Sequence, residues 1–263
     1  MLSKSLSLIL DRTQETGSFA IFTAGVLTGI FRKMPRWTLL LPQVIKIGVL
    51  SLPVVLLTGM FTGMVLAIQT HSQFSRVNLE SLLGAVVSVS MVREIGPVLT
   101  GLVLAGRIGA SMTAELGSMK VSEQIDALRA LGSDPILYLA VPRFLACLLL
   151  VPLLTAYSDL IGILGGRLVA VHVLNVDAHF YWVYSAQYVE TWDILAGLFK
   201  AAVFGAMLCL ICCFKGFTAR GGAEGVGKAT TEANVATSIA IIIANFFLAV
   251  LLRSLYANLY GTY

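Results

Sequence analysis

The chain has 263 residues, of which 57% are hydrophobic and only 12% carry a charge, and its mean hydropathy is +0.88. Soluble domains carry about 25% charged residues, so the composition predicts an all-α integral membrane protein that crosses the bilayer several times. The net charge of +4 is small and spread along the chain, with no basic run interleaved with aromatic residues, which argues against a nucleic-acid partner.

The N-terminal region, residues 1–40, contains one short apolar run, residues 19–31. About 20 apolar residues are needed to cross a bilayer, so this run is too short to span. Arg32, Lys33 and Arg36 follow it immediately. This arrangement predicts an amphipathic helix in the cytoplasmic interface of the membrane. The alternative is a short packed helix without membrane contact.

Residues 41–263 are predicted to form one transmembrane domain with five spans. The predicted spans are residues 42–70, 82–115, 136–174, 194–214 and 235–252. The first span carries Gly59-x-x-x-Gly63, a spacing of small residues that lets two helices approach closely. The second span is longer than a hydrocarbon core of ~30 Å requires, so it must tilt, break near Pro97 or project beyond the bilayer.

The distribution of Lys and Arg decides whether residues 136–174 cross the bilayer once or twice. With one crossing, residues 1–46, 115–143 and 215–234 lie on the same side and hold six, three and three basic residues. The opposite side then holds very few, and this asymmetry obeys the positive-inside rule. The sequence therefore predicts five spans, with the N-terminus cytoplasmic and the C-terminus periplasmic.

Charged residues inside the predicted spans are the candidates for function. Arg93 and Glu94 lie in the second span, and charges at that depth usually face a bundle interior or a pathway. Helix neighbours point about 100° apart, so these two need not pair with each other. Their functional interpretation is a polar element of a substrate route, and the structural one is charge neutralised by neighbouring helices. Arg107 and Arg167 lie nearer span ends, where they can snorkel to headgroups, and Asp159 fits either interpretation.

A short amphipathic segment, about residues 118–132, follows the second span outside the membrane. Its apolar stripe is Val121, Ile125, Leu128 and Leu131, and its charged positions are Lys120, Glu123, Asp126 and Arg129. Gly132 suits a left-handed C-terminal cap, and Pro135 prevents continuation of the helix. A helix of about 12 residues is stable mainly through packing of its apolar stripe, and the chain's own loops are expected to offer little surface there. The segment is therefore predicted to dock into a partner protein.

Two patterns resemble known sites without satisfying their requirements. Cys209-x-x-Cys212-Cys213 lies in an apolar run with no histidine nearby, so we interpret these residues as packing rather than as a metal site. Residues 222–228 match most of the phosphate-loop pattern, but Ala229 stands where a hydroxyl is needed and no core strand precedes them. A Gly-rich turn is expected there. No catalytic residue, metal site or cofactor site is predicted in this chain.

Three stretches of the chain resemble the signatures of a known family. Residues 92–128 look like the main signature of the MlaE family of ABC-transporter permeases, which serve Mce-type lipid transport systems. Residues 221–238 and 59–69 are similar to its second and third signatures. Family members often carry an aspartate early in the last span, where this chain has Asn245.

The resemblance implies a homodimeric permease in the bacterial inner membrane, bound to two copies of a cytoplasmic ABC ATPase that holds ATP and Mg²⁺. It also implies an Mce-domain periplasmic partner, a STAS-domain regulator in some systems, and phospholipid moving between the inner and outer membranes. Residues 118–132 would be the coupling helix that contacts the ATPase. The residues expected to line the lipid cavity are Leu66, Arg93, Glu94 and Val98.

An ion-coupled secondary transporter or a channel, with Arg93 and Glu94 as its ion-linked site, is the alternative function. Neither function needs an ATP site in this chain. The amphipathic segment outside the bilayer favours the permease with an ATPase partner, because such a segment needs something to dock against.

Overall fold

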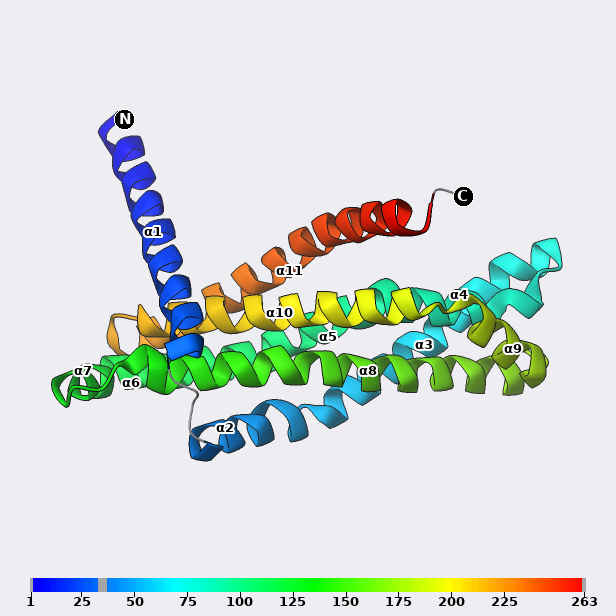
Figure 1. Ribbon diagram of the computed structural model, residues 1–263, viewed down its shortest axis with the longest axis horizontal. Coiled ribbons are helices and arrows are strands. Elements are labelled where there is room, and N and C mark those ends of the chain that lie inside the picture. Colours follow the sequence, from blue (N-terminus) through cyan, green and yellow to red (C-terminus); the bar gives the residue numbers. More distant parts are fainter. Residues whose placement is uncertain (1, 33–36, 262–263) are drawn as a thin grey trace.

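The computed structural model describes residues 2–32 and 37–261, and within these ranges every regular element is helical. The helices form an elongated bundle, from which α1 rises at a steep angle (Figure 1). The α-helices are α1 (Leu2–Arg32), α2 (Trp37–Val44), α3 (Leu52–Phe74), α4 (Leu83–Ser90), α5 (Gly96–Leu104), α6 (Ala110–Val121), α7 (Gln124–Ala130), α8 (Val141–His172), α9 (Ala178–Tyr188), α10 (Thr191–Phe217) and α11 (Gly222–Tyr260). Short π-helical segments are η1 (Ile45–Val49), η4 (Met91–Ile95), η5 (Ala105–Gly109) and η6 (Ile136–Ala140), and 3-10 turns are η2 (Ser75–Val77) and η3 (Glu80–Leu82).

Five helical stretches of the described chain are long and apolar enough to cross a membrane, which confirms the predicted all-α fold with five spans. They are Trp37–Val77, Glu80–Val121, Ile136–His172, Thr191–Phe217 and Gly222–Leu259. The third stretch is a single helical rod, as the charge distribution predicts. One end of the bundle holds α7 and the opposite end holds α9 (Figure 1), and we call these the α7 end and the α9 end.

The second span contains two π-helical turns rather than a break. The first of them, η4, comes directly before α5, which has Pro97 in its first turn. Proline removes a backbone donor and crowds the preceding turn of a helix, and a wider π turn accommodates both effects. Such turns are frequent at functional sites, and η4 carries both Arg93 and Glu94.

Glycines bring α3 and α8 into direct backbone contact. A Cβ added at Gly63 would lie 1.9 Å from the carbonyl oxygen of Gly162, and one at Gly59 would lie 2.7 Å from that of Ser158. These distances are shorter than any van der Waals contact, so only glycine permits this approach. The Gly59-x-x-x-Gly63 spacing therefore does pack two helices closely, and its partner is the third span.

The predicted Gly-rich turn at residues 222–228 is wrong. α11 already begins at Gly222 and is helical throughout its length. The turn lies just before it, where Gly221 adopts a φ of +92°, a conformation that favours glycine. A glycine inside a helix costs about 1 kcal/mol, and packing of α11 against α6 and α10 offsets this cost.

The segment 120–131 is not one helix, which corrects the prediction of a single amphipathic element. α6 continues through Val121, Glu123 adopts a φ of +61°, and only then does α7 begin. The predicted C-terminal cap is present, because Gly132 has a φ of +73° and the Ser133 N–H donates to the carbonyl of Leu128 at 3.0 Å. The left-handed turn at Glu123 folds α7 against α6 instead of extending it.

The expectation that the chain itself offers little surface to the apolar stripe holds for only half of the stripe. Ile125 is fully buried, and Leu128 is partly buried against the main apolar core. Val121 and Leu131 remain exposed, Leu131 at 79%. Half of the stripe is thus used for packing within the chain, and the other half stays open.

α1 is a single helix that is longer than the predicted apolar run. Phe22 and Val26 are buried against the bundle, whereas Ile21 on another face is 76% exposed. The helix therefore has a packed face and an exposed apolar one. Lys33 and Arg36, on which the interfacial prediction also rests, lie outside the described residues.

Candidate functional site

Two ion pairs and an amide connect η4 to α10 and α11 within the spans. Arg93 Nε donates to Asp193 Oδ1 at 2.5 Å. Lys200 Nζ lies 2.6 Å from Glu94 Oε1 and also donates to the carbonyl of Arg93 at 3.2 Å. Asn245 of α11 donates through its side-chain amide to Glu94 Oε2 at 3.1 Å. We call these five residues the charge cluster.

Local features of α10 place its two charges against η4. Asp193 belongs to a capping box, in which its Oδ2 accepts from the backbone N–H of Glu190 at 3.1 Å. Gly197 lies one turn further along, and a Cβ there would lie 2.2 Å from the carbonyl oxygen of Val92. Residues three and four apart share a helix face, so Lys200 follows on the face that this close approach presses against η4.

Each ion pair joins a buried partner to a half-exposed one. Asp193 and Lys200 expose 0% and 3% of their side chains, whereas Arg93 and Glu94 expose 49% and 44%. A buried charge is costly unless it is paired and further hydrogen-bonded, and both buried groups here have a second backbone partner. The buried groups anchor η4, and the half-exposed groups stay accessible.

The four charged members of the cluster line a pocket of about 580 Å³ between η4, α10 and α11. Its other lining residues are mostly apolar or aromatic: Trp192, Ala196, Phe246, Ala249, Val250, Leu252, Arg253 and Tyr256. Binding pockets of about 300–1,000 Å³ usually combine an apolar wall with a few placed polar groups. This pocket fits that description, with four charged residues on the η4 and α10 sides and a mostly apolar surface on the α11 side, where Arg253 is the exception.

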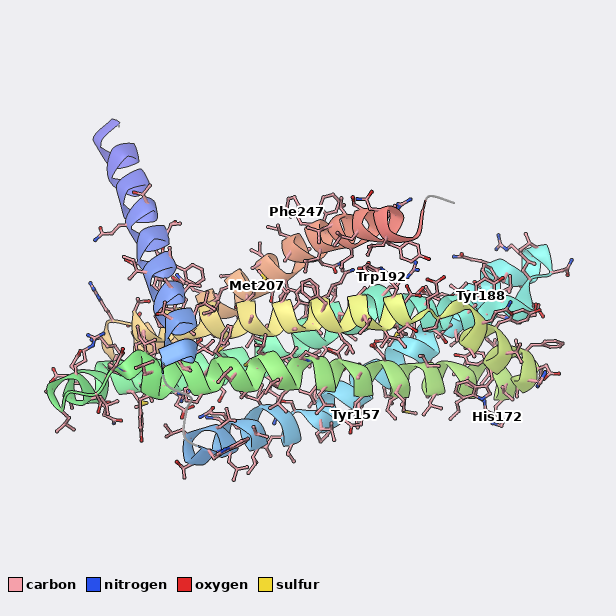
Figure 2. All side chains as sticks on the ribbon, viewed as in Figure 1. Tyr157, His172, Tyr188, Trp192, Met207 and Phe247 are labelled. Carbon is pink, nitrogen blue, oxygen red and sulfur yellow. The ribbon has the colours of Figure 1, made fainter. Side chains whose placement is uncertain are left out.

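The pocket exists because α11 diverges from α10 toward the α9 end (Figure 1). α11 packs on the bundle through Ala233, Thr237 and Ile241, which are fully buried and one helical turn apart. Beyond this row the backbone of α11 diverges from α10 (Figure 1), and side chains bridge the space, as in the hydrogen bond from the Tyr256 hydroxyl to Glu190 Oε2 at 2.9 Å. Figure 2 shows Trp192 at the start of α10 and Phe247 on the α11 side that faces away from the bundle.

The four residues predicted to line one cavity do not share a pocket in this chain. Arg93 and Glu94 line the pocket just described. Leu66 lines a separate hollow of about 350 Å³ on α3, together with Ile95 of η4. Val98 is partly buried against the main apolar core. The segment η4 thus borders both hollows and separates them.

Asp193 and Lys200 are members of the charge cluster that the sequence reasoning missed. Lys200 lies inside the predicted span 194–214, and the cost of a charge at that depth is the signal that identified Arg93. The same rule therefore flags Lys200. Asp193 precedes that span by one residue, and no local pattern distinguishes it from a loop aspartate.

Two of the other charges in the spans, Arg107 and Arg167, have contacts within the chain, whereas Asp159 has a buried Oδ1 without a hydrogen-bond partner among the described residues. The guanidinium of Arg107 donates to Ser51 Oγ at 2.8 Å between helices, which is a structural contact. Arg167 lies 5.6 Å from the ring centre of Trp182, a cation–π geometry. Asp159 is buried beside Gly96, where an added Cβ would collide with its carboxylate.

The α7 segment carries its own small charge network. Lys120 Nζ lies 2.7 Å from Asp126 Oδ2, and Arg129 lies 3.3 Å from Oδ1 of the same carboxylate. The hydrogen bond from Lys120, followed by the charges of Lys120 and Arg129, lowers the pKa of Asp126 below its ordinary value of 3.8. Glu123 does not join this network, because it forms the left-handed turn before α7.

Comparisons with known proteins agree with this architecture. The family described as Permease MlaE matches residues 40–251. A Rickettsia bellii protein named "Probable ABC transporter permease protein" is 44% identical over 235 residues, which cover 89% of this chain and 91% of the relative. The chloroplastic protein TRIGALACTOSYLDIACYLGLYCEROL 1 of Arabidopsis thaliana is 39% identical over 232 residues, covering 88% and 66%.

A further relative from Haemophilus influenzae is named the intermembrane phospholipid transport system permease protein MlaE. It is 35% identical over 245 residues, which cover 93% of this chain and 94% of the relative. The family match reaches all five spans, from residue 40 in the first to residue 251 in the last. The chain therefore belongs to the MlaE family of ABC-transporter permeases.

Proposed function

We propose that this chain is the permease subunit of an ABC transporter that moves phospholipid between inner and outer membranes. The observation that carries the proposal is the amphipathic pocket at the charge cluster. A phospholipid joins a charged headgroup to apolar chains, and the pocket offers a matching division. The name of the Haemophilus influenzae relative supports the same cargo.

In this proposal the half-exposed ends of the two ion pairs contact the headgroup. The planar guanidinium of Arg93 matches phosphate oxygens, and the carboxylate of Glu94 suits a headgroup ammonium. Each already has a buried partner, so a headgroup exchanges one pairing for another rather than introducing an unpaired charge. Apolar side chains of α11, such as Phe246 and Val250, then cover the first part of the acyl chains.

We propose that two copies of a cytoplasmic ABC ATPase drive transport and that they dock at the α7 end. Exposed Leu131 and Val121 provide the apolar contact. α7 lies between the second and third spans. Glu115 of the second span pairs with Lys46 of the first span at 2.6 Å and with Arg143 of the third span at 3.2 Å. A displacement of α7 would therefore be transmitted to three spans. ATP and Mg²⁺ belong to that partner.

A second copy of this chain, an Mce-domain periplasmic protein and a STAS-domain regulator complete the proposed assembly. Their support is family membership. The second copy has additional support, because α11 leaves a row of large apolar side chains exposed. These residues are Val235, Ile239, Ile242, Ile243, Phe246, Phe247, Val250 and Leu251.

We propose that the α7 end is cytoplasmic, with the C-terminus at the periplasmic end, because the basic residues concentrate at the α7 end. Single cysteines at Ser133 and Gln187, both exposed, test this orientation on a background in which the four buried native cysteines are replaced. An impermeant thiol reagent should label Gln187→Cys, but not Ser133→Cys, from the periplasmic side. Labelling of both from one side would contradict the orientation.

The function is tested by filling the pocket. Ala249→Trp places a large side chain in the pocket, whereas Leu149→Trp adds the same side chain to an exposed position of α8, outside the pocket and outside the exposed row of α11. The complex is purified in mild detergent, its lipids are identified, and ATP-dependent transfer of a labelled phospholipid is measured in vesicles. We expect a large loss of transfer for Ala249→Trp and near-normal transfer for Leu149→Trp. Equal rates would exclude this pocket, and uptake that follows an ion gradient without an ATPase would support a secondary transporter.

A further inference from the structure

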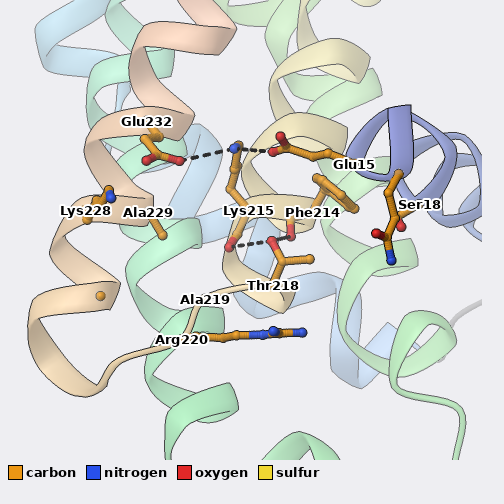
Figure 3. A pocket seen from close by; sticks show the side chains of 12 residues that line it. Glu15, Ser18, Phe214, Lys215, Thr218, Ala219, Arg220, Lys228, Ala229 and Glu232 are labelled. Carbon is orange, nitrogen blue, oxygen red and sulfur yellow. Dashed lines mark hydrogen bonds and ion pairs between the residues drawn. The ribbon is translucent and has the colours of Figure 1, made fainter. Parts of the chain in front are cut away.

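A second pocket lies at the α7 end, far from the charge cluster along α10 and α11. It has a volume of about 480 Å³ and is formed by α1, the C-terminal end of α10, the 218–221 turn and the first turns of α11 (Figure 3). Lys215, Arg220 and Lys228 line it, together with Glu15 and Glu232. None of the predicted site residues belongs to this pocket.

Lys215 holds the walls of the pocket together. Its ammonium lies 2.6 Å from Glu15 of α1 and 3.2 Å from Glu232 of α11 (Figure 3). The ring of Phe214, one residue earlier, meets Phe19 of α1 edge-on at 5.3 Å between ring centres. Three helices that are far apart in sequence are thus fixed around one space.

Arg220 and Lys228 give the lining of the pocket a net positive charge. Three cations and two carboxylates line the pocket, so the lining has one excess positive charge. Lys215 is already bound to both carboxylates, whereas Arg220 and Lys228 form no ion pair with any described residue. In Figure 3 the Arg220 side chain extends across the pocket below Lys215. The N-terminal end of α11, which also borders the pocket, favours an anion as well.

We propose that this pocket binds a phosphate group through Arg220 and Lys228, and that an anionic lipid headgroup carries this phosphate. Arginine and lysine are both effective phosphate ligands, and the volume lies within the range of small-ligand sites. α1 forms one wall of the pocket and exposes an apolar side chain, Ile21, of the kind that enters a membrane interface. Lipid headgroups occupy that interface. Free phosphate has the same chemistry and is the alternative source.

The site is separate from the proposed cargo pocket and does not depend on the cargo assignment. α1 contributes Glu15 and Ser18 to the lining, and Lys215 holds α1 to the bundle through Glu15. An anion bound here would therefore lie beside the contact that positions α1. Lipid composition would therefore influence how α1 is positioned.

The test measures how fast an amine-reactive reagent modifies Lys228, read residue by residue by mass spectrometry. The full-length protein is placed in nanodiscs of phosphatidylcholine alone or with phosphatidylglycerol, and in detergent with or without inorganic phosphate. We expect phosphatidylglycerol to slow Lys228 modification severalfold and inorganic phosphate to have no effect. Lys120, which pairs with Asp126 on α7, provides the internal control.

Arg220→Gln should abolish the protection of Lys228, whereas Arg129→Gln, with the same loss of charge at the α7 end, should retain it. Protection by inorganic phosphate alone would assign the site to a free anion and overturn the lipid source. No protection under either condition, or full protection in Arg220→Gln, would overturn the site. Lys200→Met alters only the charge cluster and should keep the protection, so a failure of the proposed transport function and a failure of this site can be distinguished.

Discussion

The pair α3–α8 and the pair α10–α11 show two opposite ways of joining helices in one bundle. α3 and α8 meet along glycines, with backbone atoms in contact across Gly63 and Gly162. α10 and α11 meet at the α7 end, where Thr237 is fully buried, and then separate toward the α9 end. The first pair leaves no room for a ligand, and the second encloses the amphipathic pocket.

Side-chain size along the contact accounts for the difference. Small residues let helices approach, and α8 continues its glycine contacts through Gly165. On α10 and α11 the opposing residues of the open half include Trp192, Phe246 and Tyr256, which keep the backbones apart. Charged side chains differ between the two pairs in the same way. The charge cluster at α10 and α11 opens to the pocket, whereas Asp159 of α8 is buried. The closed pair provides stability and the open pair provides a binding surface.

Gly63→Ala should have the largest effect on stability, because it disrupts the close packing of α3 against α8. The new Cβ would collide with the Gly162 carbonyl oxygen, which belongs to a backbone that cannot yield easily. We expect a loss of about 4 kcal/mol or more in the free energy of unfolding, the range typical of severe core strain. The matched control is Gly106→Ala, where an added Cβ meets no atom within 4 Å. Thermal unfolding in mild detergent measures both, and equal stability would refute the role of the glycine contact.

Glu94→Gln and Lys200→Met should separate the stability of the cluster from its function. Glu94→Gln leaves the buried ammonium of Lys200 without its carboxylate, and we expect a loss of about 2–3 kcal/mol, below the range for fully buried pairs because Glu94 is half exposed. Lys200→Met leaves a carboxylate that water and Asn245 still reach, so about 1 kcal/mol is expected. Both variants should impair phospholipid transfer. Greater destabilisation by Lys200→Met would contradict the observed asymmetry of burial.

Leu131→Asp tests the α7 end without altering either helix pair. Leu131 is exposed, so the substitution should leave thermal stability almost unchanged while it weakens binding of the ATPase. Leu128→Asp, in contrast, places a charge against the core and should lower stability as well. Pull-down of the ATPase and thermal unfolding are measured on both variants. Normal ATPase binding by Leu131→Asp would exclude this residue from the docking contact.

Acidification should give the smallest effect, confined to α7. The pKa of Asp126 is lower in the folded chain than its ordinary 3.8, so the stabilisation from its pairing is present above that value. It is lost as the pH falls through the lower, folded pKa. Hydrogen exchange of α7 amides should therefore accelerate more between pH 5 and about 3 in the wild type than in Asp126→Asn, after correction for the intrinsic pH dependence. An identical pH response in both proteins would exclude this carboxylate as the cause.

Local properties of the sequence determined the number of spans, the Gly132 cap and the choice of Arg93 and Glu94 as candidate functional residues. Hydropathy over about 20 residues identifies a span, and a charge inside such a run is conspicuous whatever lies around it. The signature at residues 92–128 likewise identified the family. Each of these inferences depends on residues that are close together in the chain, and each needs no knowledge of which helices meet.

Only the tertiary structure decided which charges pair, where the pocket lies and which half of the α7 stripe is free. Arg93 and Asp193 are 100 residues apart, and Glu94 and Lys200 are 106 apart. Such pairs depend on which helices are neighbours and on how closely their backbones approach. The pocket depends further on the angle between α10 and α11, which side-chain sizes on both helices set together. Periodicity within one segment contains no information about its partner, and so it could not indicate that Glu94 pairs with Lys200.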